Sequence, residues 1–98
     1  MTYRIRFAES VKGQLRKLSA GERAQLLDAI EQQLSYEPLV ETRNRKPLRP
    51  NPVAPWELRV GDLRAFYEVA AEANEVLVLA VGRKRGHRLW IGDEEVRL

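Results

Sequence analysis

The fold is decided by the stretch WELRVGDLRAFYEV, residues 56–69. Apolar and polar residues alternate from Trp56 to Val60 and from Leu63 to Ala65, on both sides of Gly61-Asp62, a pair suited to a two-residue turn. The stretch therefore predicts a β-hairpin. A two-residue turn fixes which residues face each other. Arg59 is therefore expected directly opposite Arg64, with Glu57 on the same face of the hairpin.

Two arginines placed opposite each other have two possible explanations. Like charges in this position destabilise a sheet by a few tenths of a kcal/mol up to ~1 kcal/mol, whereas an anion held between them would turn the repulsion into a clamp. Alternatively, Glu57 neutralises the arginines in a surface ion-pair network that contributes little. Carried across a second turn, the register places Val81 beside Arg64. We therefore expect Arg59, Arg64 and Arg83 to share one patch.

The segments before the hairpin predict one strand and two helices. Apolar residues alternate over residues 3–7, which is typical of a strand, and from residue 9 they follow a helical period to about Leu18. Ser19 and Glu22 match a capping box, which predicts that a second helix begins there. This helix should end near Tyr36, because proline at position 38 disfavours helical geometry in the residue before it.

Residues 38–55 contain all five prolines, so we expect a long loop without regular structure. Residues 75–81 form an apolar run typical of a buried central strand. The order is a strand, a helix hairpin and three antiparallel strands. It predicts an α+β fold of two layers in a single domain spanning residues 1–98.

The positive charge lies in two blocks. Residues 43–64 carry six basic and two acidic residues, a net charge of +4, and residues 83–88 carry four basic residues and no acidic ones. Arginine outnumbers lysine 13 to 4, and its planar fork suits phosphate. Two blocks of the same sign favour a polyanionic partner, although a solvated basic surface is the alternative.

Several classes of site are disfavoured by composition. The chain has no cysteine and a single histidine, His87, so disulfides and thiol nucleophiles are excluded and a metal site is improbable. We expect no metal and no cofactor. The chain has no apolar run of about 18 residues and no block typical of a signal peptide. We therefore expect a cytoplasmic protein without a membrane partner.

Taken together, these features resemble the RelE/ParE superfamily of toxins from type II toxin–antitoxin systems. The resemblance rests on the order of the elements, the basic loop, WELRVGDLR at 56–64, Phe66-Tyr67 and VGRK at 81–84. RelE-like members cut mRNA in the ribosomal A site without a metal, using the 2′-hydroxyl of the RNA as nucleophile. ParE-like members inhibit DNA gyrase and lack nuclease residues. The resemblance implies a cognate antitoxin and, as the favoured activity, an mRNA endoribonuclease acting with the ribosome; gyrase inhibition is the alternative.

The resemblance also implies roles for individual residues. Arg59 and Arg64 match residues that clamp the scissile phosphate. Lys84, or its neighbour Arg83, matches a basic residue after the last strand that stabilises the phosphate or the leaving group. Glu57 stands where some members carry lysine, while other members use a glutamate base elsewhere in the site. His87 lies where a histidine could act as general acid, or it is an exposed residue that contacts the RNA backbone. The catalytic prediction is Arg64, Arg59, Glu57, Lys84 and His87; the RNA-binding prediction is Arg83, Arg85, Arg88, Arg43, Arg45, Lys46 and Trp90.

Trp90 departs from the family pattern, since many of these nucleases carry tyrosine at the corresponding place. An indole can stack on a base, but its N–H only donates and cannot accept a proton. The alternative is that Trp90 packs together with Leu89 and Ile91 on the second apolar face of the sheet, over Leu77, Leu79 and Phe66.

Overall fold

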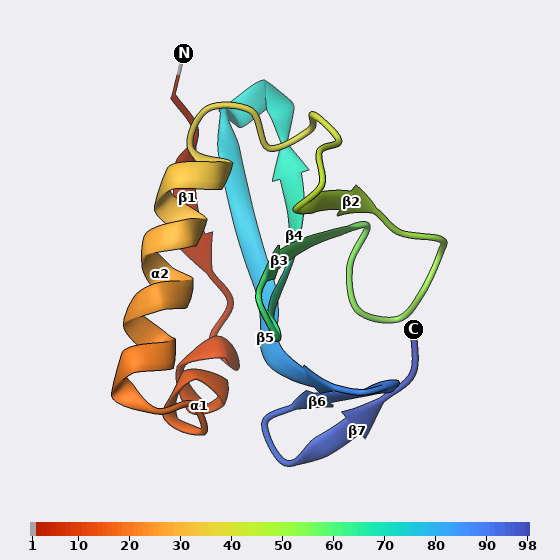
Figure 1. Ribbon diagram of the computed structural model, residues 1–98. Coiled ribbons are helices and arrows are strands. Elements are labelled where there is room, and N and C mark those ends of the chain that lie inside the picture. The colour runs from red at the N-terminus through yellow and green to blue at the C-terminus, as the bar shows by residue number, and fades with distance from the viewer. Residues whose placement is uncertain (1) are drawn as a thin grey trace.

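A seven-stranded sheet with two helices on one face makes up the computed structural model, which describes residues 2–98 (Figure 1). The strand order is β2-β3-β4-β5-β6-β7, and β1 pairs with β5 as its only parallel neighbour among the described residues. The elements are β1 (Arg4–Phe7), α1 (Val11–Arg16), α2 (Ala20–Leu34), β2 (Arg45–Pro47), β3 (Trp56–Val60), β4 (Leu63–Ala70), a 3₁₀ turn (Ala71–Ala73), β5 (Glu75–Arg85), β6 (Arg88–Ile91) and β7 (Glu94–Val96).

The predicted hairpin is confirmed residue by residue. Strands β3 and β4 pair antiparallel around Gly61-Asp62, and Arg59 lies opposite Arg64. Gly61 has a φ of +59°, a left-handed conformation that glycine adopts without strain. The two-residue turn therefore sets the register, as expected.

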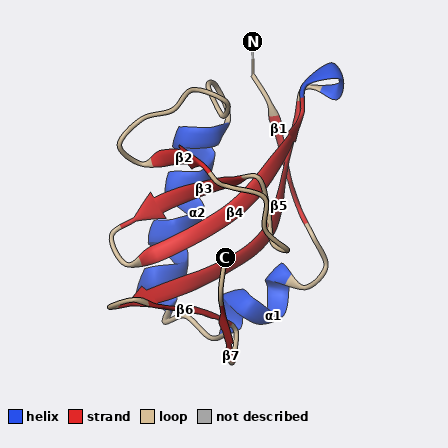
Figure 2. Ribbon diagram, turned by 90° about the vertical axis from the view of Figure 1, so that its right-hand side faces the viewer, coloured by secondary structure: helices blue, strands red, loops and turns tan. Residues whose placement is uncertain are grey.

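The two predicted helices are present and are joined by a short connection, and the capping box at the start of α2 is confirmed. The Ser19 hydroxyl accepts a hydrogen bond from the Glu22 amide at 3.1 Å, and the Glu22 carboxylate accepts one from the Ser19 amide at 2.9 Å. These reciprocal bonds satisfy two donors that a helix N-terminus leaves free. In Figure 2, α2 runs behind the strands and covers one face of the sheet.

Each face of the sheet has its own apolar cluster. The helix-facing cluster joins the buried sides of α1 and α2 to alternate residues of β3, β4 and β5. The smaller cluster on the opposite face gathers under the loop before β3. The buried members of the first cluster are Val11, Leu18, Leu26, Ile30, Leu34, Leu58, Leu63, Ala65, Tyr67, Val76, Val78 and Val81, and those of the second are Ala54, Phe66, Ala80 and Leu89.

The expectation of a structureless loop over residues 38–55 is wrong at one point. Residues 45–47 form β2, which pairs antiparallel with β3 at the edge of the sheet. An edge strand tolerates proline because one row of its backbone donors faces no neighbour, so Pro47 does not prevent pairing. The Thr42 hydroxyl accepts hydrogen bonds from the Asn44 and Arg45 amides and so bends the chain into the strand.

The predicted register between β4 and β5, which placed Val81 beside Arg64, is wrong, because the pairing shifts by one residue between Tyr67 and Phe66. Ala80 faces Phe66 and Val78 faces Tyr67, so Leu79 is an extra residue on β5. An inserted residue shifts the alternation of every side chain that follows it. Gly82, not Val81, therefore lies opposite Arg64, and Arg83 lies opposite Leu63 on the helix-facing side.

The chain after residue 82 continues in strands that the sequence analysis did not predict. Strand β5 extends to Arg85, and β6 and β7 follow it through tight turns. Trp90 lies opposite Arg83 and therefore also on the helix-facing side. Leu89 and Ile91 pack against the second cluster as expected, but Trp90 does not join them there.

Gly82 is required where the backbone of β6 comes close to β5. A Cβ atom at this position would overlap the carbonyl oxygen of Trp90 and approach the Ile91 side chain at 3.1 Å. We predict that Gly82→Ala lowers the free energy of unfolding by about 1–3 kcal/mol, because the backbone of β6 has to move away. Chemical denaturation measures the change. Gly13→Ala in α1, where a Cβ meets nothing within 4 Å, is the control. It should stabilise the protein by up to about 1 kcal/mol, and an unchanged Gly82→Ala variant would contradict the structure.

Candidate functional site

Glu57 contacts both of the facing arginines. Its Oε2 accepts a hydrogen bond from Arg59 Nε at 2.8 Å, and its Oε1 lies 3.6 Å from Arg64 Nε. The side chains of Glu57 and Arg64 are 7% and 11% exposed, whereas that of Arg59 is 44% exposed. A buried carboxylate thus compensates the positive charge of the arginine pair, as the ion-pair explanation requires. The Oε1 atom of this carboxylate has no hydrogen bond to Arg64.

Arg64 is held in place by the turn that precedes it. Its Nη1 donates to the carbonyl oxygens of Gly61 at 2.6 Å and Leu63 at 2.9 Å. Its Nε is buried and has no hydrogen-bond partner within residues 2–98. Burial lowers the pKa of Arg64 from its ordinary value; Glu57 opposes this shift and Arg59 adds to it. A bound anion would stabilise this desolvated cation.

A cleft of about 580 Å³ opens beside Glu57 on the face away from the helices. We call it the Glu57 cleft, and the polar residues that line it are Glu57, Lys84, His87, Arg88, Glu95 and Arg97. Lys84 reaches the cleft because its backbone amide donates to the Asp62 carbonyl at 2.8 Å, which ties this part of β5 to the turn of the hairpin. Three residues of the catalytic prediction, Glu57, Lys84 and His87, therefore line one cleft.

Strand β2 adds a lysine to the same face. Lys46 lies opposite Glu57 in the β2–β3 ladder, and its ammonium group lies 3.6 Å from the Glu41 carboxylate. Basic side chains from β2, β3, β4 and β5 thus surround a single buried carboxylate. Such an arrangement suits a phosphodiester, which presents negative charge to several donors at once.

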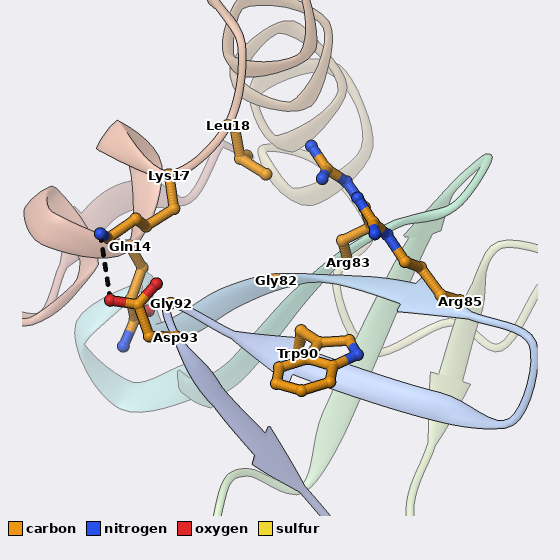
Figure 3. Close-up of a pocket in the computed structure, with 9 residues that line it drawn as sticks. All are labelled: Gln14, Lys17, Leu18, Gly82, Arg83, Arg85, Trp90, Gly92 and Asp93. Carbon is orange, nitrogen blue, oxygen red and sulfur yellow. Dashed lines mark ion pairs between the residues drawn. The ribbon is translucent and has the colours of Figure 1, made fainter.

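Arg83 does not belong to this face, so the expected patch of three arginines is wrong. Its guanidinium pairs with the Glu22 carboxylate at the N-terminus of α2. This contact and the Ser19 amide together lower the pKa of Glu22, and the backbone hydrogen bond is the larger cause. Arg83 instead lines a second cavity of about 290 Å³, which we call the Trp90 pocket. Its polar and aromatic lining comes from Gln14, Lys17, Arg83, Arg85, Trp90 and Asp93 (Figure 3).

Arg45 is buried and holds the loop before β2 in place. This differs from the prediction that it contacts RNA. It is 8% exposed, and its guanidinium donates to the Val40 carbonyl at 2.9 Å and to the carbonyl and side-chain oxygens of Gln33 at 2.9 and 3.0 Å. The neighbouring Tyr67 hydroxyl donates to the Pro38 carbonyl at 2.7 Å, and burial raises its pKa. These bonds fasten residues 33–40 to the sheet. Arg43, two residues away, is exposed.

Residues 5–87 match the family described as the ParE toxin of type II toxin–antitoxin systems, parDE. The chain belongs to this toxin family. The RelE/ParE resemblance of the sequence is thereby confirmed, and the protein is a toxin of a type II toxin–antitoxin system. A search of curated proteins finds no match.

Two solved structures show the same fold as this toxin. A chain of the toxin–antitoxin complex RelBE2 from Mycobacterium tuberculosis is 30% identical with a TM-score of 0.75, covering 86% of the toxin and 93% of that chain. A chain of the RelE–RelB complex from Pyrococcus horikoshii OT3 is 25% identical with a TM-score of 0.65, covering 89% of the toxin and 99% of that chain. The α+β RelE-like fold expected from the sequence is therefore confirmed.

Some residues of the two cavities carried no signal in the sequence. Glu95 in β7 and Arg97 directly after it line the Glu57 cleft, and β7 is a strand of three residues that is too short to show alternation. Gln14 and Lys17 reach the Trp90 pocket from the end of α1, which is distant in sequence from β6. Within residues 2–98 no three His, Cys, Asp or Glu side chains are grouped to hold a metal ion, and no helix is long and apolar enough to span a membrane.

The role assigned to Arg45 is testable through stability. We predict that Arg45→Met lowers the free energy of unfolding by about 2–4 kcal/mol, because it leaves buried carbonyl groups without donors. Arg43→Met, which removes an exposed arginine from the same loop, should change it by less than about 0.5 kcal/mol. Urea denaturation of both variants measures the difference. Equal stability of the two variants would show that the bonds of Arg45 do not hold the loop.

Proposed function

We propose that this toxin is a metal-independent endoribonuclease that cuts mRNA on the ribosome. The proposal is carried by one observation: a carboxylate, an ammonium and an imidazole line the same cleft, contributed by Glu57, Lys84 and His87. Cleavage of RNA by its own 2′-hydroxyl needs a base for the hydroxyl proton, cations for the charge on phosphorus and an acid for the leaving oxygen. These side chains supply all three requirements.

The proposed reaction proceeds by attack within the RNA. Oε1 of Glu57 accepts the 2′-hydroxyl proton as the 2′-oxygen bonds to phosphorus, while Oε2 stays on Arg59. The bond from phosphorus to the 5′-oxygen breaks, and the leaving oxygen takes a proton from His87 in its imidazolium form. Lys84 and Arg64 stabilise the negative charge that grows on the phosphoryl oxygens. The products are a 2′,3′-cyclic phosphate and a 5′-hydroxyl.

A cognate antitoxin is the proposed partner of the toxin. One of the two similar structures is the toxin–antitoxin complex RelBE2, and the other is a RelE–RelB complex. The basic residues of the Glu57 cleft are a surface that an acidic protein segment complements. Occupation of the cleft by such a segment would exclude RNA.

Gyrase inhibition is the second candidate, and two observations favour it. Glu57 lies against both guanidinium groups, so the arginine pair is already compensated without a phosphate. The matching family is also that of ParE toxins. The resemblance described for the sequence implies that ParE-like members inhibit DNA gyrase. In this alternative the cationic face binds protein, and the carboxylate has only a structural role.

Cleavage on ribosomes tests the proposal. We expect the purified toxin to generate new mRNA ends at A-site codons in a primer-extension assay of translating ribosomes. Lys84→Ala should slow the cleavage about 10²–10³-fold, because it removes a cation at the developing charge, and His87→Ala should slow it about 10²–10⁴-fold. Lys12→Ala, which removes an exposed lysine of α1, is the control and should cleave at the wild-type rate.

The same preparations separate the two candidates. New mRNA ends that depend on Lys84, together with normal gyrase supercoiling, support the endoribonuclease. Intact mRNA together with inhibited supercoiling would overturn it in favour of gyrase inhibition. Cleavage that persists unchanged in Lys84→Ala would show that the Glu57 cleft is not the site of the reaction.

A further inference from the structure

Strand β5 has a gap in the pairing along one of its edges. Strand β1 pairs with this edge as far as Val78, and β6 begins to pair with it at Arg83. Within the part of the chain that the structure describes, residues 79–82 therefore have β4 on one side and no strand on the other. A backbone amide that points into such a gap needs another acceptor.

Gln14 of α1 supplies this acceptor. Its Oε1 accepts a hydrogen bond from the Val81 amide at 2.9 Å, across 67 residues of sequence. Gln14 is partly buried, and its Cγ lies 3.8 Å from the place that a Cβ atom of Gly92 would occupy. This side chain thus reaches both β5 and the turn between β6 and β7, and it fills the gap in the sheet that no strand fills.

A second contact joins the end of α1 to the same turn. Lys17 Nζ lies 3.0 Å from a carboxylate oxygen of Asp93 (Figure 3). Both side chains are more than half exposed, so this ion pair contributes little on its own. The partly buried hydrogen bond of Gln14 is therefore the contact that fixes β5 against α1.

The elements held by Gln14 carry one wall of the Glu57 cleft. Lys84 follows Val81 by three residues on β5, and His87 lies in the turn that joins β5 to β6. The opposite wall, with Glu57, belongs to β3. The two walls meet where the Lys84 amide donates to the Asp62 carbonyl. A shift of β5 at Val81 would thus move an ammonium and an imidazole relative to the carboxylate.

We propose that Gln14 is a positioning residue for the reaction in the Glu57 cleft. It acts through the backbone of β5, by setting the positions of Lys84 and His87 relative to Glu57. The inference rests on the proposed function, which gives these side chains their roles. Misplaced catalytic groups lower the rate more than the affinity for substrate, because the charges that they stabilise develop only in the transition state.

Three variants test the proposal. Gln14→Met keeps the length of the side chain and removes the acceptor, whereas Gln14→Glu keeps an oxygen that can accept from the Val81 amide. Gln25→Met makes the same change as the first variant on an exposed glutamine of α2 and is the matched control. Circular dichroism establishes that each variant is folded before it is compared with the wild type.

NMR spectroscopy of the free toxin reports on the position of this wall without any cleavage. We expect solvent exchange of the Val81 amide, relative to that of the Leu58 amide in β3, to become at least about tenfold faster in Gln14→Met, because its acceptor is lost. The imidazole signals of His87, the single histidine of the chain, should shift in the same variant. Gln14→Glu and Gln25→Met should keep the exchange rate and the signals of the wild type.

Cleavage on ribosomes measures the catalytic consequence. Gln14→Met should lower kcat about 10–10²-fold and change KM less than about twofold, since the groups that act in the transition state are displaced. Gln14→Glu should restore kcat to within about threefold of the wild type, and Gln25→Met should match it.

Each outcome decides the proposal. Faster exchange of the Val81 amide, shifted His87 signals and a lower kcat in Gln14→Met, all rescued in Gln14→Glu, support it. An unchanged kcat in Gln14→Met, a rise in KM alone, or an equal loss in Gln25→Met overturns it. A wild type that does not cleave mRNA contradicts the proposed function. The NMR comparison then decides separately whether Gln14 holds this wall of the cleft, and exchange and signals that stay unchanged in Gln14→Met overturn that role.

Discussion

The contact of Glu57 with Arg59 and Arg64 is the constraint on which the rest of the site depends. It exists because a two-residue turn at Gly61-Asp62 holds the two arginines opposite each other. Without the carboxylate, two like charges would face each other across the sheet, one of them largely buried. The carboxylate compensates the positive charge of this pair, and its Oε1 atom still has no hydrogen bond to Arg64. The same geometry therefore stabilises the hairpin and leaves Oε1 of Glu57 as the acceptor for the proposed reaction.

The extra residue at Leu79 distributes the basic residues of β5 between two faces. It shifts the alternation, so that Arg83 and Arg85 lie on the side of the helices and Lys84 lies beside Glu57. A regular ladder would have brought Arg83 to the arginine pair and turned Lys84 away. One inserted residue thus decides which cation faces the proposed scissile phosphate, and it supplies the Trp90 pocket with its positive charge.

The sequence predicted those features that depend on local rules. The hairpin register followed from a turn of two residues, the second helix began at its capping box, and the order of elements gave the fold of the family. The bulge at Leu79 was not predicted, because nothing in an apolar run marks the residue that will lack a partner. The burial of Arg45 was not predicted either. Its acceptors are carbonyl groups of Gln33 and Val40, whose positions depend on how α2 and the loop pack against the sheet.

A double-mutant cycle between Glu57 and Arg64 tests the central claim most directly. The free energy of unfolding is measured for the wild type, Glu57→Gln, Arg64→Met and the double variant. If the carboxylate holds the arginine pair, the two substitutions are coupled by roughly 1–3 kcal/mol, and the double variant loses less stability than the sum of the single ones. Effects that add to within about 0.5 kcal/mol would show that Glu57 and Arg64 do not interact, and the proposed site would lose its foundation.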